Sequence, residues 1–107
     1  MVIKKIVKDK IALLTINREE ALNAMNPLIL NELKDIFKNC IEDENIRVII
    51  LTGSGKKAFI AGADIKIMDK LDSKSAYDFG LLGQELTNII ENSTKPVIAL
   101  VNGFALG

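Results

Sequence analysis

The chain has 107 residues with 14 basic and 14 acidic side chains, no histidine and one cysteine. This length suits one domain or part of one, and the balanced charge argues against a nucleic-acid binder, which needs a basic face. Without histidine there is no Ser-His-Asp triad and no histidine metal site. The lone Cys40 excludes an internal disulfide, and no stretch is typical of a signal peptide or a membrane helix. We therefore expect a cytoplasmic protein with no nucleic-acid or membrane partner.

The first part of the chain predicts a β-hairpin followed by a polar segment. Residues 2–7 and 11–16 are β-rich apolar runs, and a polar turn at residues 8–10 separates them. Residues 17–26 are polar and irregular, which indicates a connection.

A helix is predicted to begin at Asn26 and Pro27, an N-cap residue followed by proline at the first helical position. Apolar residues at spacings of three and four continue to about Asp43, so the helix has one buried stripe. Cys40 lies on this stripe, and we expect it to serve packing rather than chemistry.

Further elements follow from residue 47 onward. Residues 47–52 form a continuous apolar run that is typical of a strand buried on both faces. Residues 57–60 predict another short strand, the small residues 61–64 a tight loop, and Asp64 the cap of a short helix through about Leu71.

The last elements are a second long helix and a strand. Asp72 or Ser73 is expected to cap the helix, and residues 97–101 form the strand. Gly80 and Gly83 interrupt the helix at a cost of about 1 kcal/mol each, which close helix packing would explain. Strands that alternate with helices in this way indicate an α/β chain. The second long helix is expected to bury a stripe that consists of Ala76, Phe79, Leu82, Leu86, Ile89 and Ile90.

The chain ends at Gly107, directly after an apolar strand and without a polar tail. Domains usually end at exposed polar positions, so we expect the sequence to be a piece of a longer protein. Apolar sheet surface left uncovered at this end would favour association into a homo-oligomer.

Two phosphate-binding motifs fail at residues 53–57. A P-loop would need glycine where Ile50 stands and Ser or Thr where Lys57 stands. The dinucleotide pattern would need glycine at Ala58. A solvated turn is the favoured interpretation of this segment.

Residues 59–66 are more informative. Their small side chains leave room for a ligand to approach the backbone, and N–H groups near Asp64 lie at the start of a helix, where an oxyanion can be stabilised. Lys66 could meet a phosphate. On the local pattern alone, an ordinary capped turn with a solvated lysine is the favoured interpretation. No pair of acidic residues is fixed in one pocket by its spacing.

Three segments in order resemble the enoyl-CoA hydratase (crotonase) family. Residues 17–25 resemble its NRPxALNAL signature, residues 57–66 its KAFxAGADIKEM signature, and residues 95–107 the opening of its KPxIAAVNGxALGGGxEL signature. The resemblance implies the N-terminal portion of a crotonase-fold domain, a spiral of ββα units that usually forms trimers or paired trimers. It also implies an acyl-CoA thioester as substrate, with no metal and no separate cofactor.

The resemblance assigns the family's site residues to positions in this chain. The first of two backbone N–H groups that hold the thioester oxygen corresponds to Ala63, and the second would be the glycine after Gly107. The expected CoA-binding residues are Ala21, Leu22 and Ala24 along the nucleotide and pantetheine path, Ala61, Asp64 and Ile65 on the adenine side, and Lys66 near the phosphates.

Both catalytic glutamates of hydratases would lie beyond Gly107. The resemblance therefore implies an N-terminal fragment of an enoyl-CoA hydratase or 3-hydroxyacyl-CoA dehydratase that is inactive alone, because water addition needs both acids. An isomerase, a hydrolase and a non-catalytic CoA-binding or assembly module remain alternatives. The chain departs from the family pattern at Glu19 and Glu20, and an acid at position 20 would weaken phosphate attraction.

Overall fold

The computed structural model describes residues 2–107, which begin with the predicted hairpin. Strands β1 (Ile3–Lys8) and β2 (Ile11–Ile16) pair antiparallel from Ile3 opposite Ile16 to Lys8 opposite Ile11. Asp9 and Lys10 form the turn with φ values of 53° and 66°, the left-handed conformation that two-residue hairpins favour. The hairpin prediction is confirmed.

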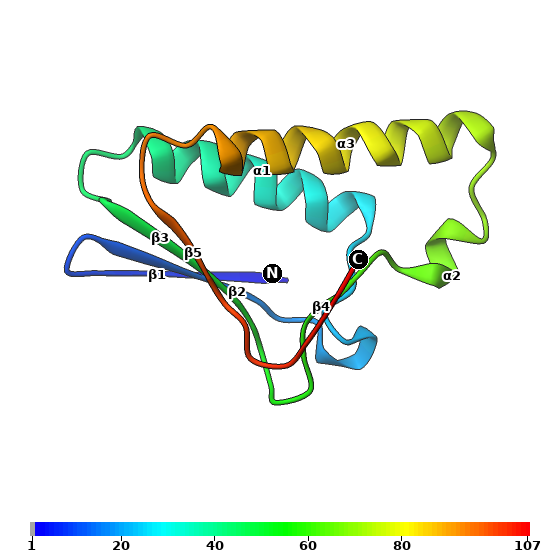
Figure 1. The fold of residues 1–107 in the computed structure, drawn as a ribbon, viewed down its shortest axis with the longest axis horizontal. Coiled ribbons are helices and arrows are strands. Elements are labelled where there is room, and N and C mark those ends of the chain that lie inside the picture. Colours follow the sequence, from blue (N-terminus) through cyan, green and yellow to red (C-terminus); the bar gives the residue numbers. More distant parts are fainter. Residues whose placement is uncertain (1) are drawn as a thin grey trace.

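The remaining strands are divided between two sheets (Figure 1). Strands β3 (Val48–Gly53) and β5 (Val97–Leu100) extend the hairpin into a four-stranded sheet of order β1-β2-β3-β5, in which β2, β3 and β5 run parallel. Strands β4 (Ala58–Ala61) and β6 (Phe104–Leu106) form a separate parallel pair. Strand β6 is absent from the sequence-based prediction, which ended the last strand at residue 101.

Helix α1 (Pro27–Glu42) begins as predicted, because the Asn26 side chain accepts a hydrogen bond from the Ile29 N–H at 2.8 Å. Its buried face includes Phe37 and Cys40, neither of which is accessible to solvent. Burial raises the pKa of the Cys40 thiol, which fits the expected packing role.

The other helical segments differ more from expectation. A 3₁₀ turn, η1 (Glu19–Ala21), lies within the polar connection. Helix α2 (Ile65–Met68) ends before Leu71, because the hydrogen bonds from Lys70 and Leu71 reach back only three residues. Helix α3 (Ser73–Glu91) is capped by Asp72, whose side chain accepts from the Ser75 N–H.

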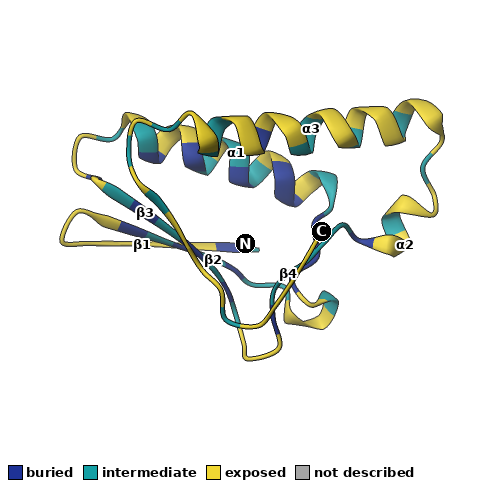
Figure 2. Ribbon diagram, viewed as in Figure 1, coloured by how far each residue is buried: buried dark blue, intermediate teal, exposed yellow. Residues whose placement is uncertain are grey.

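The two long helices lie side by side on one face of the four-stranded sheet (Figure 1). The prediction that β3 is buried on both faces is therefore wrong. Ile49 and Leu51 face the helices and are buried, whereas Val48, Ile50 and Thr52 on the other face are only half-buried (Figure 2).

The predicted stripe of α3 is also less buried than expected. Of its members only Leu86 is fully buried, and Ala76 is exposed. The first half of α3 extends past the start of α1, so α1 does not cover that part of the stripe (Figure 1). An added Cβ at Gly80 or Gly83 would meet no atom within 4 Å, so close helix packing does not explain these glycines.

The last two strands expose apolar side chains, as the sequence predicted. Ile98 and Leu100 of β5 are 48% and 54% exposed, and Phe104 and Leu106 of β6 are 61% and 58% exposed. The outer edges of β5 and β6 pair with no strand among residues 2–107.

Lys95 joins the start of β5 to the end of α1. Its Nζ donates to the carbonyls of Cys40 and Asp43 at 2.7 and 2.6 Å, and the last carbonyls of a helix have no partner within the helix.

We expect Lys95→Met to lower the free energy of unfolding by about 1–2 kcal/mol in urea titrations, because charged hydrogen bonds are lost. Lys38→Met, at an exposed position of α1, is the control and should change it by less than about 0.5 kcal/mol. Equal effects of the two substitutions would contradict this role.

Candidate functional site

The peptide group between Gly62 and Ala63 has an unusual orientation. Gly62 has a φ of 75°, which glycine adopts without strain. Its carbonyl accepts the Met25 N–H at 2.8 Å, and the Asp64 N–H donates to the Met25 carbonyl at 2.7 Å. The N–H and C=O of a trans peptide point in opposite directions, so the Ala63 N–H points away from Met25. No backbone carbonyl among residues 2–107 accepts it.

Strand β6 lies beside Gly62, on the other side from Met25. Ala61 is paired with Leu106, and a Cβ at Gly62 would lie 2.8 Å from the Gly107 carbonyl oxygen. Only glycine therefore meets both the backbone conformation and the space available at position 62.

A cavity of about 440 Å³ with four charged residues in its lining, hereafter the polar cavity, opens on one side of Ala63. All eight residues that the resemblance assigned to the site line it, together with the charged side chains of Arg18 and Glu20. The structure thus brings residues 18–24 and 61–66 together around one space. The eight residues are Ala21, Leu22, Ala24, Ala61, Ala63, Asp64, Ile65 and Lys66.

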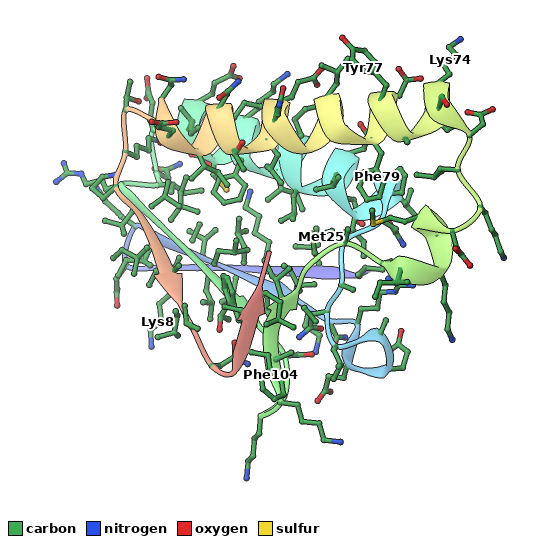
Figure 3. The ribbon with its side chains drawn as sticks, turned by 45° about the vertical axis from the view of Figure 1, so that its right-hand side comes forward. Lys8, Met25, Lys74, Tyr77, Phe79 and Phe104 are labelled. Atoms are coloured by element: carbon green, nitrogen blue, oxygen red, sulfur yellow. The ribbon has the colours of Figure 1, made fainter. Side chains whose placement is uncertain are left out.

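A second cavity, also about 440 Å³, is bounded by α2, the first half of α3 and the end of β6. Its lining is apolar and includes Met25 and Phe79, which Figure 3 shows beneath α3. Ala63 is the one residue that lines both this apolar cavity and the polar cavity.

Arg18 and Asp64 form an ion pair in the wall of the polar cavity. Arg18 Nη2 lies 2.9 Å from Asp64 Oδ2, with side-chain exposures of 21% and 10%. Asp64 Oδ1 accepts from the Lys66 N–H at 3.0 Å, so both carboxylate oxygens have partners. The hydrogen bonds from Arg18 and then from Lys66 hold the pKa of the Asp64 carboxyl below its ordinary value.

Asn23 supports the polar cavity from behind. It is 1% exposed and has a φ of 57°, a conformation that asparagine tolerates better than most residues. Its Oδ1 accepts from the Arg18 N–H at 2.9 Å, and its Nδ2 donates to the carbonyls of Ser54 and Ala58 at 3.1 and 3.0 Å. Asn23 thereby ties the loop at residues 17–25 to the β3–β4 turn.

A comparison with protein families identifies the family of this chain. Residues 7–107 match the family model described as enoyl-CoA hydratase/isomerase. The chain belongs to this family. The sequence-based resemblance is therefore confirmed.

Relatives with assigned names agree with this family. The chain is 49% identical over 100 residues to crotonyl-CoA hydratase of Syntrophomonas wolfei, and 45% identical over 100 residues to short-chain-enoyl-CoA hydratase of Clostridium acetobutylicum. Each alignment covers 94% of this chain and 38% of the relative, so the chain spans less than half the length of these proteins.

Solved structures give the same fold. The crystal structure of enoyl-CoA hydratase from Bacillus anthracis matches with a TM-score of 0.97 and 33% identity, covering 100% of this chain and 42% of that chain. The predicted fold class, an α/β arrangement that forms the N-terminal part of the crotonase fold, is confirmed.

Two further findings concern residues 2–107. None of the helices there is both long and apolar enough to cross a membrane. The same part of the chain contains no group of three His, Cys, Asp or Glu side chains placed to hold a metal ion.

Sequence reasoning found the residues along the cavity but not those that orient them. Arg18 and Met25 belong to the recognised motifs, yet no role followed from their spacing. The only signal for the ion pair was the opposite charge of Arg18 and Asp64. The turned peptide at Gly62 was signalled only by a glycine among small residues.

Protonation of Asp64 should remove the contribution of the ion pair. Because the pKa of Asp64 is lowered in the folded protein, this contribution is present above the unfolded pKa, about 4, and is lost as the pH falls through the lower folded value. In urea titrations, Asp64→Asn should therefore be less stable than the unsubstituted chain at pH 7, with a difference that shrinks below about pH 4.

Asp35→Asn is the matched control for this prediction. Asp35 lies exposed on α1, outside the cavity wall, and its substitution should have little effect at pH 7. A stability difference for Asp64→Asn that stays constant from pH 7 to pH 2 would show that the pair is not the cause.

Proposed function

We propose that this chain is the thioester-binding, N-terminal part of an enoyl-CoA hydratase whose complete form adds water reversibly to a trans-2-enoyl-CoA. The observation that carries the proposal is the position of Ala63, which lines both cavities and whose backbone N–H has no acceptor among residues 2–107. An acyl-CoA has a polar nucleotide, a thioester carbonyl and an apolar tail in this order. A polar cavity, an N–H donor and an apolar cavity follow one another in the same order here.

The Ala63 N–H is proposed as one donor of an oxyanion hole. During water addition, negative charge develops on the thioester oxygen as it becomes enolate-like, and a fixed donor of this kind contributes about 3–4 kcal/mol to lowering the barrier. Since Gly107 lies beside Gly62, a residue that continued β6 would come to lie opposite Ala63. That is the position from which a second N–H would complete the hole.

The polar cavity is proposed to hold CoA. Ala21, Leu22 and Ala24 form one wall, where small and apolar side chains suit the pantetheine arm. Ile65 is 78% exposed and Lys66 is exposed at the mouth, where the amine would attract phosphate. For Asp64 we propose a structural role in this wall, because Arg18 and the Lys66 N–H already occupy its carboxylate.

The described residues lack an acid–base pair for the chemical step. The apolar cavity, where the acyl double bond would lie, has no ionisable side chain in its lining. In the polar cavity the acidic groups are Glu20 and the paired Asp64. We therefore propose that this chain binds thioesters but does not hydrate them, because general acid–base catalysis needs positioned carboxylates.

Hydration is favoured over isomerisation or thioester hydrolysis, since both named relatives are hydratases. The proposed reaction needs no metal and no cofactor apart from the CoA of the substrate. A cytoplasmic location and a homo-oligomeric state remain part of the proposal.

Calorimetric titration and an activity assay test the proposal together. The chain should bind butyryl-CoA more tightly than CoA, since each buried methylene adds about 0.8 kcal/mol. With crotonyl-CoA it should show no hydration above background, whereas the Syntrophomonas wolfei crotonyl-CoA hydratase serves as the active control. Failure to bind either CoA compound would refute the thioester site, and turnover near the control's rate would refute the assignment of the chemistry to other residues.

Self-association is predicted from the uncovered sheet face. Ile6, Leu13, Ile50 and Ile98 pair in register across the four strands, and Ile6 and Ile98 are 60% and 48% exposed. Light scattering should show a dimer or larger species, and the double substitution of Ile6 and Ile98 by lysine should yield monomers. Leu28→Lys, on α1 and 68% exposed in the unsubstituted chain, is the control that should keep the oligomer. A stable monomer of the unsubstituted chain would contradict this prediction.

A further inference from the structure

The ion pair between Arg18 and Asp64 joins the two segments that meet at Met25 and Ala63. Arg18 Nη1 donates to the Ala24 carbonyl at 3.1 Å, and Nη2 pairs with Asp64 at 2.9 Å. Ala24 directly precedes Met25, and Asp64 directly follows Ala63. One guanidinium group therefore holds the neighbour of each residue in the bridge.

The direction of the Ala63 N–H depends on this arrangement. Met25 fixes the Gly62 carbonyl and the Asp64 N–H by hydrogen bonds of 2.8 and 2.7 Å, so Ala63 is held from both sides. The side chain of Asp64 is held in turn by Arg18 and by the Lys66 N–H. The Ala24 carbonyl and the Met25 N–H belong to one planar peptide, so Arg18, by holding this carbonyl, also holds the N–H that bonds the Gly62 carbonyl.

The ion pair also neutralises a negative charge close to the Ala63 N–H. Asp64 carries a negative charge one residue from the N–H that is proposed to meet a developing oxyanion. A carboxylate without a partner so near this N–H would repel the negative charge that builds up on the thioester oxygen. Arg18 Nη2 neutralises the carboxylate while Nη1 bonds the Ala24 carbonyl, and the planar guanidinium holds these two contacts at fixed angles, which a lysine ammonium does not do.

We propose that Arg18 and Asp64 are positioning residues that aim the Ala63 N–H at the thioester oxygen. They act through the backbone and do not contact the reacting atoms. This inference rests on the proposed thioester site and adds a specific role for two residues of its wall.

The test compares two ligands that differ in the carbonyl. Butyryl-CoA has the thioester oxygen, whereas S-butyl-CoA is a thioether with the same nucleotide and a similar tail. In calorimetric titrations of the unsubstituted chain, we expect the thioester to bind about threefold to tenfold more tightly, the net worth of one hydrogen bond. In Arg18→Met this ratio should fall to about one, and any change in the CoA-binding wall should affect the affinities for both ligands alike, because they share the same nucleotide.

Three variants make the result decisive. In Arg18→Met with Asp64→Leu, an apolar pair replaces the ion pair and preserves folding if the single variants are unstable. This double variant should also lose the preference for the thioester. Arg18→Lys keeps the charge and should restore only part of it. Lys34→Met breaks a separate ion pair with Glu85 between α1 and α3, and should leave the ratio unchanged.

Each outcome bears on one of the two proposals. A full thioester preference in Arg18→Met or in the double variant would overturn the positioning role and leave the thioester site intact. Equal affinities for the two ligands in the unsubstituted chain would show that Ala63 is not aimed at the carbonyl, which also overturns the positioning role. If the unsubstituted chain binds neither ligand, the proposed function itself fails.

Discussion

Two hydrogen bonds between Met25 and the backbone on either side of Ala63 set the direction of the Ala63 N–H, on which the proposed function depends. They hold the Gly62 carbonyl and the Asp64 N–H on one side, so the Ala63 N–H must face the other. The left-handed φ of Gly62 makes this orientation possible without strain. A polar group left without a protein partner next to two cavities is costly unless water or a ligand satisfies it. The proposed thioester site follows from this constraint.

In the proposed function, the two cavities separate recognition of the substrate from its chemistry. The polar cavity has charged groups from Arg18, Glu20, Asp64 and Lys66, and the apolar cavity has none in its lining. Such a division suits a ligand with a charged handle and an apolar tail. In the proposed function, the groups that transfer protons therefore come from outside residues 2–107. The chain covers 38% of the length of the hydratases it matches, which leaves room for those groups elsewhere in proteins of this family.

Local patterns predicted much of the fold and of the cavity lining. The hairpin and the start of α1 at Asn26 depend on neighbouring residues only, and both were predicted. Strand β6 is only three residues long and exists through its parallel pairing with β4, a contact between distant segments that no local pattern indicates. The exposure of α3 depends on where α1 begins beneath it. The pairing of Arg18 with Asp64 depends on the meeting of two loops. The site residues themselves were found through the family motifs, because spacing alone did not distinguish a thioester site from an ordinary capped turn.

The most direct test is the NMR signal of the Ala63 amide proton in the isotope-labelled chain. With saturating butyryl-CoA this proton should move downfield, because it forms a hydrogen bond to the thioester oxygen, and S-butyl-CoA should leave it near its free position. The Asp64 amide, already bonded to Met25, is the internal reference and should move little with either ligand. An Ala63 amide that does not respond to bound butyryl-CoA, or that responds equally to both ligands, would contradict the proposal that this N–H receives the acyl carbonyl.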